Sequence, residues 1–238
     1  MRARRRWLMH CSVLGLALAG SASQGAPAAK SAATNGAASS GAANGAAKGG
    51  AATTRVILIV GDSLSAEYGL ARGTGWVALL EQRLVKEQLP AKVINASISG
   101  DTTSGGRSRL ADLLKAHRPS HVVIELGGND ALRGLPLDMT RANLSAMAQA
   151  AKAAQAKVML LGMQVPPNYG GRYGRDFAAL FSDIAKAQGA ALVPFLLAGV
   201  ADSAQAETLF QPDRIHPAAQ AHPTMANNVW VVLKPWLR

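Results

Sequence analysis

Five short apolar runs alternate with longer helical patterns in the part of the chain that begins at Arg55, and this alternation constrains the fold more than any other feature. The apolar runs cover 55–60, 92–97, 121–126, 157–162 and 191–195, and the helical patterns cover 75–88, 104–117, 138–155, 174–188 and 218–234. The run at 55–60 is continuously apolar after Arg55 rather than alternating, as in the strands of a sheet that is covered on both faces, and the other runs are similar to it. The sequence therefore predicts one α/β domain over 55–238, a three-layer α/β/α sandwich with a five-stranded parallel sheet.

The first 23 residues have the features of a secretory signal peptide. A basic start, MRARRR, precedes the apolar stretch WLMHCSVLGLALAG, and small residues follow at Ala19, Ser21 and Ala22. The apolar stretch is shorter than the ~20 residues that span a bilayer, and the small residues suit a signal peptidase. Cys11 lies inside the apolar stretch rather than after it, which argues against a lipid anchor. We therefore expect cleavage and export to the periplasm, with an uncleaved membrane anchor as the alternative.

Residues 24–54 consist almost entirely of Ala, Gly, Ser, Asn and Thr. They have no large apolar side chains and cannot bury enough surface to offset the entropy lost on ordering, so we predict a disordered linker. An Ala-rich helix is the alternative, which the repeated glycines weaken. Because Cys11 is the only cysteine, signal cleavage would leave a protein without a disulfide, a thiol nucleophile or a cysteine-ligated zinc.

The formal net charge of +11 is unevenly distributed along the chain. Residues 1–54 contain six Lys and Arg and no acidic residue, which leaves 19 basic against 14 acidic residues from Arg55 onward. The basic residues of 55–238 are scattered rather than gathered into a stripe. No nucleic-acid partner is therefore expected.

A serine follows the first predicted strand, in the segment Gly61-Asp62-Ser63-Leu64. In a strand-to-helix turn, Ser63 would lie near backbone N–H groups and a helix N-terminus, where developing negative charge is stabilised. Helix capping is the alternative interpretation, because Ser and Asp are common caps, and we expect Asp62 to shape the turn or to cap the following helix. The segment is not a G-x-S-x-G nucleophile elbow, since Ser65 stands where the last glycine would be.

Further loop residues follow the second and third predicted strands. They are Ser99-Gly100-Asp101 and Gly127-Gly128-Asn129-Asp130. In parallel α/β sheets, ligands bind beyond the carboxyl ends of the strands. The backbone N–H groups of Ser63 and Gly100 and the side chain of Asn129 would form an oxyanion hole there. Ordinary turn chemistry is the alternative. We expect Asp130 to cap or shape its turn, and Glu125 to be a buried acid with a hydrogen-bond partner.

Asp213 and His216 stand three residues apart near the C-terminus, in Asp213-Arg214-Ile215-His216-Pro217. On a tight turn, the carboxylate can accept the Nδ1–H of the imidazole and leave Nε2 free to take a proton from a serine. No other histidine is preceded by an acidic residue at this spacing. We expect structural or signal-peptide positions for the other four, which are His10, His117, His121 and His222.

Four segments resemble, in order, the signature blocks of the SGNH (GDSL) hydrolase superfamily: VGDSLS, NASISGDT, ELGGNDALRGLP and DRIHP. The longer matches, together with PPNYGGRYG, are similar to the bacterial branch of multifunctional acyl-CoA thioesterase I, arylesterase and lysophospholipase. The resemblance implies the flavodoxin-like SGNH hydrolase fold. It also implies a site in which Ser63 is the nucleophile, His216 the general base and Asp213 its orienting acid, with oxyanion donors at Ser63, Gly100 and Asn129. Pro212 and Arg214 depart from the acidic or glycine-containing stretch that is typical of the family.

These roles predict a serine esterase or thioesterase that hydrolyses aryl esters, acyl-CoA-like thioesters or lysophospholipids through an acyl-enzyme, without a metal or other cofactor. We expect a monomer that takes a small-molecule substrate and has no stable membrane anchor. The resemblance also implies that Tyr169 and Gly170, in a loop with Gly171 and Gly174, border the acyl pocket, with a plain surface loop as the alternative. Two other functions stay open: a carbohydrate O-deacetylase, and a non-catalytic doubly wound ligand-binding domain.

Overall fold

The computed structural model describes residues 54–237. The predicted signal peptide, 1–23, and all of the predicted linker except Thr54 lie outside the described residues. The described part is built on one parallel sheet in the order β2-β1-β3-β4-β5. Its strands are β1 (Arg55–Gly61), β2 (Ala91–Asn95), β3 (His121–Glu125), β4 (Lys157–Leu161) and β5 (Ala191–Val193). The five predicted strands are therefore confirmed, each within three residues of its expected bounds.

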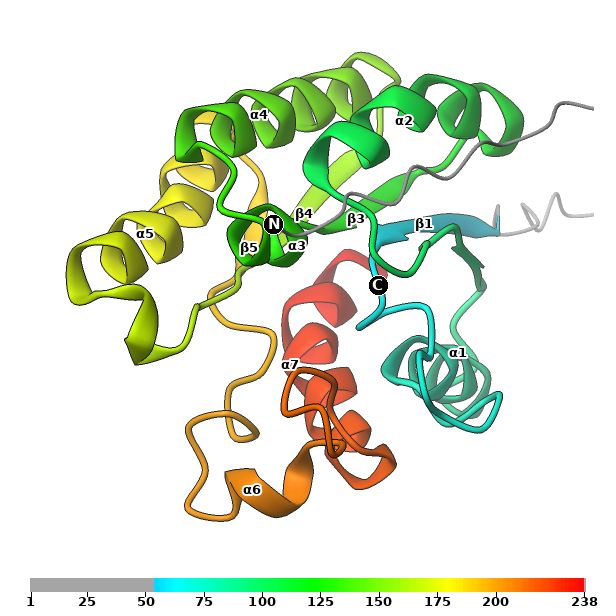
Figure 1. The fold of residues 1–238 in the computed structure, drawn as a ribbon. Coiled ribbons are helices and arrows are strands. Elements are labelled where there is room, and N and C mark those ends of the chain that lie inside the picture. The colour runs from blue at the N-terminus through cyan, green and yellow to red at the C-terminus, as the bar shows by residue number, and fades with distance from the viewer. Residues whose placement is uncertain (1–53, 238) are drawn as a thin grey trace, which may run out of the picture. The chain divides into compact units, whose positions relative to one another are not determined.

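Helices cover both faces of this sheet (Figure 1). They are α1 (Trp76–Lys86), α2 (Thr103–His117), α3 (Gly128–Leu132), α4 (Leu137–Ala153), α5 (Gly171–Gln188), α6 (Ala206–Leu209) and α7 (His222–Leu233), with short 3₁₀ turns at η1 (Pro167–Tyr169), η2 (Ala219–Ala221) and η3 (Lys234–Leu237). In Figure 1, α2, α4 and α5 lie on one side of the sheet and α1 and α7 on the other. The predicted three-layer α/β/α sandwich is confirmed.

Two short helices, α3 and α6, were not predicted from the sequence. They have five and four residues, too few for a periodic apolar pattern to show. The predicted last helix, 218–234, is also less regular than expected, because its first and last turns are η2 and η3. Such 3₁₀ turns are frequent at helix ends.

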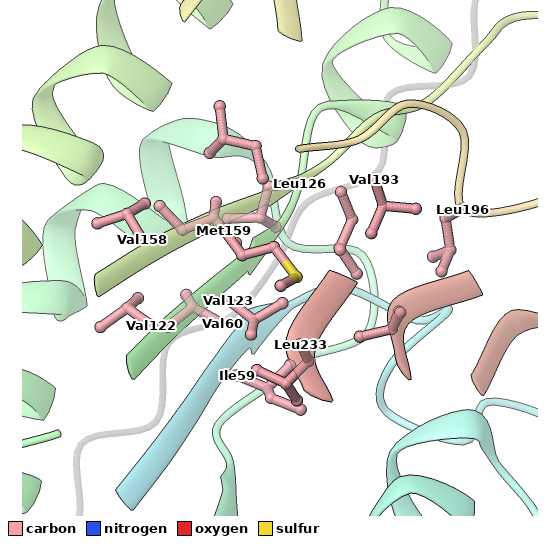
Figure 2. Close-up of a cluster of buried hydrophobic side chains, with 14 of the residues drawn as sticks. Ile59, Val60, Val122, Val123, Leu126, Val158, Met159, Val193, Leu196 and Leu233 are labelled. Atoms are coloured by element: carbon pink, nitrogen blue, oxygen red, sulfur yellow. The ribbon is translucent and has the colours of Figure 1, made fainter. Parts of the chain in front are cut away.

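The core lies on both sides of the central strands. All five residues of β3 are buried, as are residues 57–61 of β1. Figure 2 shows side chains of β1, β3 and β4 together with Leu233 of α7, and these residues belong to one buried apolar cluster. Helix α5 adds Phe177, Leu180, Phe181 and Ile184, whose spacing of three and four residues places them on one face.

The strand register determines where the polar loops meet. Gly61 at the end of β1 pairs with Glu125 at the end of β3. The segments that follow these two residues therefore leave the sheet side by side. Within residues 54–237, no helix is long and apolar enough to cross a membrane.

Candidate active site

The segment after β1 forms an irregular turn rather than the start of a helix. Asp62 shapes it, since its Oδ1 accepts a hydrogen bond from the Leu64 backbone N–H at 3.0 Å and its carbonyl accepts one from Ala66 at 3.0 Å. The expected strand-to-helix turn is wrong in one respect, because the first regular helix begins only at Trp76. Glu67 and Gly69 adopt left-handed φ values of 59° and 71°, which interrupt a right-handed helical path.

Ser63, His216 and Asp213 meet in one chain of hydrogen bonds. The Oγ of Ser63 lies 2.8 Å from Nε2 of His216, although 153 residues separate them in the sequence. Nδ1 of His216 lies 2.6 Å from Oδ2 of Asp213. Because a carboxylate only accepts hydrogen bonds, Nδ1 carries the proton and Nε2 accepts the hydroxyl proton of Ser63. This arrangement can activate a serine oxygen for attack on an acyl carbon.

The Asp213 carboxylate is held by its own turn. Its Oδ1 accepts hydrogen bonds from the backbone N–H groups of Ile215 and His216, each at 3.0 Å. Partial burial raises the pKa of Asp213, but the hydrogen bonds from the His216 side chain and from these two N–H groups outweigh it and bring the pKa to about 2. The carboxylate is therefore ionised at neutral pH and keeps the imidazole in the required tautomer.

Two residues that the sequence did not single out connect the serine turn to the histidine turn. Nε2 of Gln211 donates to the carbonyls of Tyr68 at 2.9 Å and Pro217 at 3.1 Å, and the Gln211 backbone N–H donates to the His216 carbonyl at 2.7 Å. The ring of Tyr68 lies on the imidazole of His216, with 4.4 Å between the ring centroids. Nothing in the sequence signals these contacts, because they join segments that only the fold brings together.

Asn129 lies in the first turn of α3 and reaches toward the serine turn. Its Nδ2 donates to Oδ2 of Asp62 at 3.0 Å. Gly127 precedes the helix at φ 119°, and a Cβ at this position would lie 3.2 Å from the ring of Phe181. A glycine is therefore required for the chain to enter α3 at this angle.

Gly100 has a left-handed φ of 79°, and its carbonyl accepts a hydrogen bond from Nη2 of Arg133 at 2.7 Å. Within residues 54–237, the backbone N–H groups of Ser63 and Gly100 donate to no other group of the protein. Both N–H groups are thus available to a ligand. Ser63 and Asn129 line a cavity next to His216, whereas Gly100 is not among the residues that line it.

Asp62 and Glu125 form a buried acid pair beneath this site. Oε2 of Glu125 accepts hydrogen bonds from Oγ of Ser65 at 2.7 Å and from the Asp62 backbone N–H at 3.3 Å, which confirms the expected buried acid with a partner. Burial and the neighbouring charge of Asp62 raise the pKa of Glu125 well above its ordinary value. Burial also raises the pKa of Asp62, to about 6, against the hydrogen bonds from Leu64, Glu125 and Asn129 that lower it.

A cavity of about 660 Å³ opens beside Ser63 and His216. Its walls are mostly apolar, and the apolar residues include Leu64, Leu132, Met163, Val165, Pro166, Pro167, Phe195, Leu197, Phe210 and Ile215. Its size is that of a site for a small organic molecule. Tyr169 also lines this cavity, whereas Gly170 lies in a shallower depression next to it that Tyr169 shares.

The segment around Tyr169 differs from the expected loop. Gly171 and Gly174 are helical, because α5 already begins at Gly171, and the Gly174 N–H donates to the Gly170 carbonyl at 3.0 Å. The glycines suggested a loop because glycine is a poor helix former. Only Gly170 stands at the N-cap of α5, where glycine is well tolerated. Gly171 and Gly174 lie in the helix itself, and the apolar face of α5 supplies its stability.

The remaining histidines of the described residues, and Asp130, lie outside the Ser63–His216–Asp213 chain. His117 ends α2 and His121 begins β3, and His222 accepts a hydrogen bond from the Trp76 N–H at 3.0 Å. Asp130 accepts hydrogen bonds from the Thr103 N–H at 2.9 Å, at the start of α2, and from the Thr103 hydroxyl. His10 lies outside the described residues. Among residues 54–237, no three His, Cys, Asp or Glu side chains are grouped to hold a metal ion.

Comparisons with known proteins agree on one family. Residues 59–223 match the GDSL-like Lipase/Acylhydrolase family. The chain is similar to Esterase TesA of Pseudomonas aeruginosa, with 50% identity over 78% of this chain and 91% of the relative. It is also similar to Thioesterase 1/protease 1/lysophospholipase L1 of Escherichia coli K12, with 42% identity over 77% of this chain and 86% of the relative.

Solved structures give the same result. The crystal structure of TesA matches with a TM-score of 0.74 and 50% identity, over 77% of this chain and all of that one. The psychrotrophic esterase EstA from Pseudoalteromonas sp., inhibited by monoethylphosphonate, matches with a TM-score of 0.72 and 41% identity, over 77% of this chain and 98% of that one. These similarities cover nearly the whole of both relatives.

Proposed function

The chain belongs to the GDSL-like lipase/acylhydrolase family, and on that premise we propose which of its residues carry out the reaction. It is an SGNH esterase and thioesterase of the branch that its relatives represent. We assign the nucleophile to Ser63, the general base to His216 and the orienting acid to Asp213. One observation carries this assignment: the unbroken hydrogen-bond chain from the Ser63 hydroxyl through the imidazole to the carboxylate.

The reaction divides into two acyl transfers. Oγ of Ser63 attacks the carbonyl carbon while its proton passes to Nε2 of His216, which forms a tetrahedral oxyanion. The oxyanion collapses, the bond to the leaving group breaks, and His216 protonates the leaving alcohol or thiol. Water then attacks the acyl-Ser63 ester with His216 as base, and the collapse of the second oxyanion releases the acid and returns the proton to Ser63.

The oxyanion receives hydrogen bonds from three donors in this proposal. They are the backbone N–H groups of Ser63 and Gly100 and Nδ2 of Asn129. The free N–H groups of Ser63 and Gly100 and the position of Asn129 in the cavity wall support it. Donors that are already aimed at the developing charge stabilise the transition state without reorganisation.

We further propose that the apolar cavity takes the acyl group of a small-molecule ester or thioester, with Tyr169 in its wall. The lining of Met163, Val165, Phe195 and Phe210 supports an apolar acyl chain. The relatives' names suggest aryl esters, thioesters and lysophospholipids as substrate classes, and we take acyl-CoA-like molecules as the thioesters to test. A chain-length series of p-nitrophenyl esters and acyl-CoA thioesters, assayed on the protein from Ala51 onward, will rank them.

Labelling with a fluorophosphonate tests the assignment. We expect a single covalent adduct on Ser63, identified by peptide mass spectrometry, and a loss of ~10⁴-fold or more in kcat in Ser63→Ala. Ser108→Ala, on the exposed surface of α2, is the matched control and keeps full activity. More than a tenth of wild-type activity in Ser63→Ala, or an adduct elsewhere, would overturn the assignment, and hydrolysis of acetylated sugars alone would favour an O-deacetylase.

We also propose that the protein is exported to the periplasm as a monomer without a stable membrane anchor. The basic start and the short apolar run of residues 1–23 support export. Mass spectrometry of the protein from a periplasmic extract tests this. An N-terminus between about residues 20 and 27 supports signal cleavage, whereas an intact Met1 in the membrane fraction contradicts it.

A further inference from the structure

The side-chain amide of Asn129 has one buried partner. Its Nδ2 donates to Oδ2 of Asp62 at 3.0 Å, and Asp62 is only 3% exposed. An amide group presents a donor on one side and an acceptor on the other, and the two ends have nearly the same shape. The hydrogen-bond partners of the amide therefore determine which end of Asn129 faces the cavity.

A carboxylate can determine the orientation of the amide because it only accepts hydrogen bonds. While Asp62 is ionised, only the NH₂ end of Asn129 can face it favourably. One N–H of that group is then used by Asp62, and the second remains free for the oxyanion. If the amide turned over, its oxygen would approach both the Asp62 carboxylate and the oxyanion, and each contact would be repulsive.

Two further hydrogen bonds fix Asp62. Its Oδ1 accepts the Leu64 N–H at 3.0 Å, and its backbone N–H donates to Oε2 of Glu125 at 3.3 Å. The hydroxyl of Ser65 donates to the same Oε2 at 2.7 Å and so holds Glu125 in place. This network leaves the Asp62 carboxylate little freedom to follow Asn129 if the amide rotates.

We propose that Asp62 is a positioning residue, which fixes the amide of Asn129 with its donor toward the oxyanion, and that Glu125 holds Asp62 in place as a neutral acid. This inference rests on the proposed function, because it requires an oxyanion formed at Ser63. Glu125 is only 1% exposed, and this burial disfavours its charged form and raises its pKa. Asp62 acts through Asn129 and does not itself touch the reacting atoms.

A double-mutant cycle between Asp62→Asn and Asn129→Ala tests the proposal. An amide at position 62 still accepts the Leu64 N–H, but it can donate or accept toward Asn129, so that residue can turn over. We expect Asp62→Asn to lower kcat by ~10- to 100-fold with KM nearly unchanged. This loss should not exceed the ~10²–10³-fold loss for a missing oxyanion donor, because the donor is misoriented rather than absent. In the Asn129→Ala background the same substitution should change kcat by less than about threefold.

The matched control is Asp112→Asn, which removes the same charge from an exposed position on α2. It should leave kcat unchanged in both backgrounds. The proposal is overturned if Asp62→Asn lowers kcat equally with and without Asn129, since independent structural damage is additive. It is equally overturned if a folded Asp62→Asn enzyme keeps the wild-type kcat.

A measurement on the wild-type protein covers the case in which Asp62→Asn does not fold. In a crystal structure of the protein phosphonylated at Ser63, we expect Nδ2 of Asn129 within 3.2 Å of both the phosphonyl oxygen and Asp62 Oδ2. An Asn129 that has left Asp62, or that does not reach the phosphonyl oxygen, overturns the inference. Absence of the Ser63 adduct instead overturns the proposed function, so the two failures are distinguishable.

Discussion

Strand β3 buries a titratable side chain at each end, and the two ends differ in what surrounds them. At the amino end, His121 lies beside the ring of Trp236 and 2.9 Å from the Ser120 hydroxyl. At the carboxyl end, Glu125 contacts the turn that carries Ser63. Burial lowers the pKa of His121 to about 4 and raises that of Glu125, so each favours its neutral form.

The comparison shows that a buried titratable group does not by itself mark an active site. Both groups are desolvated, but only Glu125 belongs to a hydrogen-bond network that reaches the turn of Ser63 and the cavity beside it. The carboxyl end of a parallel sheet collects the loops after several strands, and the amino end does not serve as the site in such folds. Substitutions in the loops at the carboxyl end that carry Ser63, Asn129 and His216 should therefore change the rate, and those at the amino end only the stability.

The largest effect is expected for His216→Ala, which removes the proposed general base at the carboxyl end. We expect a loss of ~10⁴-fold or more in kcat, as for triad members that act as a unit, with thermal unfolding little changed. The measurement is p-nitrophenyl ester hydrolysis together with differential scanning calorimetry. His117→Ala, at the end of α2, is the control, and comparable losses in both variants would remove the contrast between site and scaffold.

Asn129→Ala comes next in size. Removal of this proposed oxyanion donor should lower kcat by ~10²–10³-fold, about 3–4 kcal/mol of transition-state stabilisation, with KM little changed. Asn227→Ala, on the exposed side of α7, is the control. An unaltered kcat in Asn129→Ala would exclude this residue from the oxyanion hole and leave the two backbone donors.

Gly100→Ala tests the backbone rather than a side chain. The added Cβ would have space, since the nearest heavy atom is Arg133 Nη2 at 3.7 Å, but φ is 79°. The left-handed conformation costs an alanine about 1–2 kcal/mol, so we expect the N–H to shift and kcat to fall about tenfold. Gly134→Ala has a similar φ of 64° and open space. It should lose stability without losing rate, and equal rates in the two variants would contradict this prediction.

The smallest effect on the rate is expected when either end residue of β3, His121 or Glu125, is replaced by glutamine, which has a neutral side-chain amide. Glu125→Gln should keep kcat within about threefold at pH 7, because burial already favours the neutral carboxyl and an amide preserves one donor and one acceptor. His121→Gln should keep the same kcat. Loss of more than about tenfold in His121→Gln would mean that the amino end also contributes to the chemistry.

The pH dependence of stability sharpens the contrast between these two variants. Between pH 6.5 and about 4 the unfolded state binds more protons at His121 than the folded state, so wild type loses up to about 3 kcal/mol relative to His121→Gln as the pH falls. At Glu125 the folded state binds more protons above pH 4.5, so wild type loses stability relative to Glu125→Gln as the pH rises. Urea unfolding at pH 4 to 8 will show whether the two slopes have opposite sign.

Much of the fold was predictable because its signals are short in range. The strands are runs of three to seven mostly apolar residues, and their alternation with amphipathic helices leaves few topologies open. The helices α3 and α6 were missed because one turn of helix has no detectable period. The glycines of α5 were misread because the sequence does not show that a helix packed on the core can begin at Gly171.

The candidate site also has features that the sequence predicts and features that it does not. The sequence alone determined the Asp213–His216 pair, because three residues on one turn fix the distance between carboxylate and imidazole, and it placed Ser63, Gly100 and Asn129 at the ends of strands. Only the tertiary structure decided that Gln211 joins the serine and histidine turns, that Asp62 faces Asn129, and that Tyr169 but not Gly170 lines the cavity. Such contacts depend on strand order and register, which bring together residues far apart in the chain. No local pattern of side chains encodes how close two such residues lie in the folded protein.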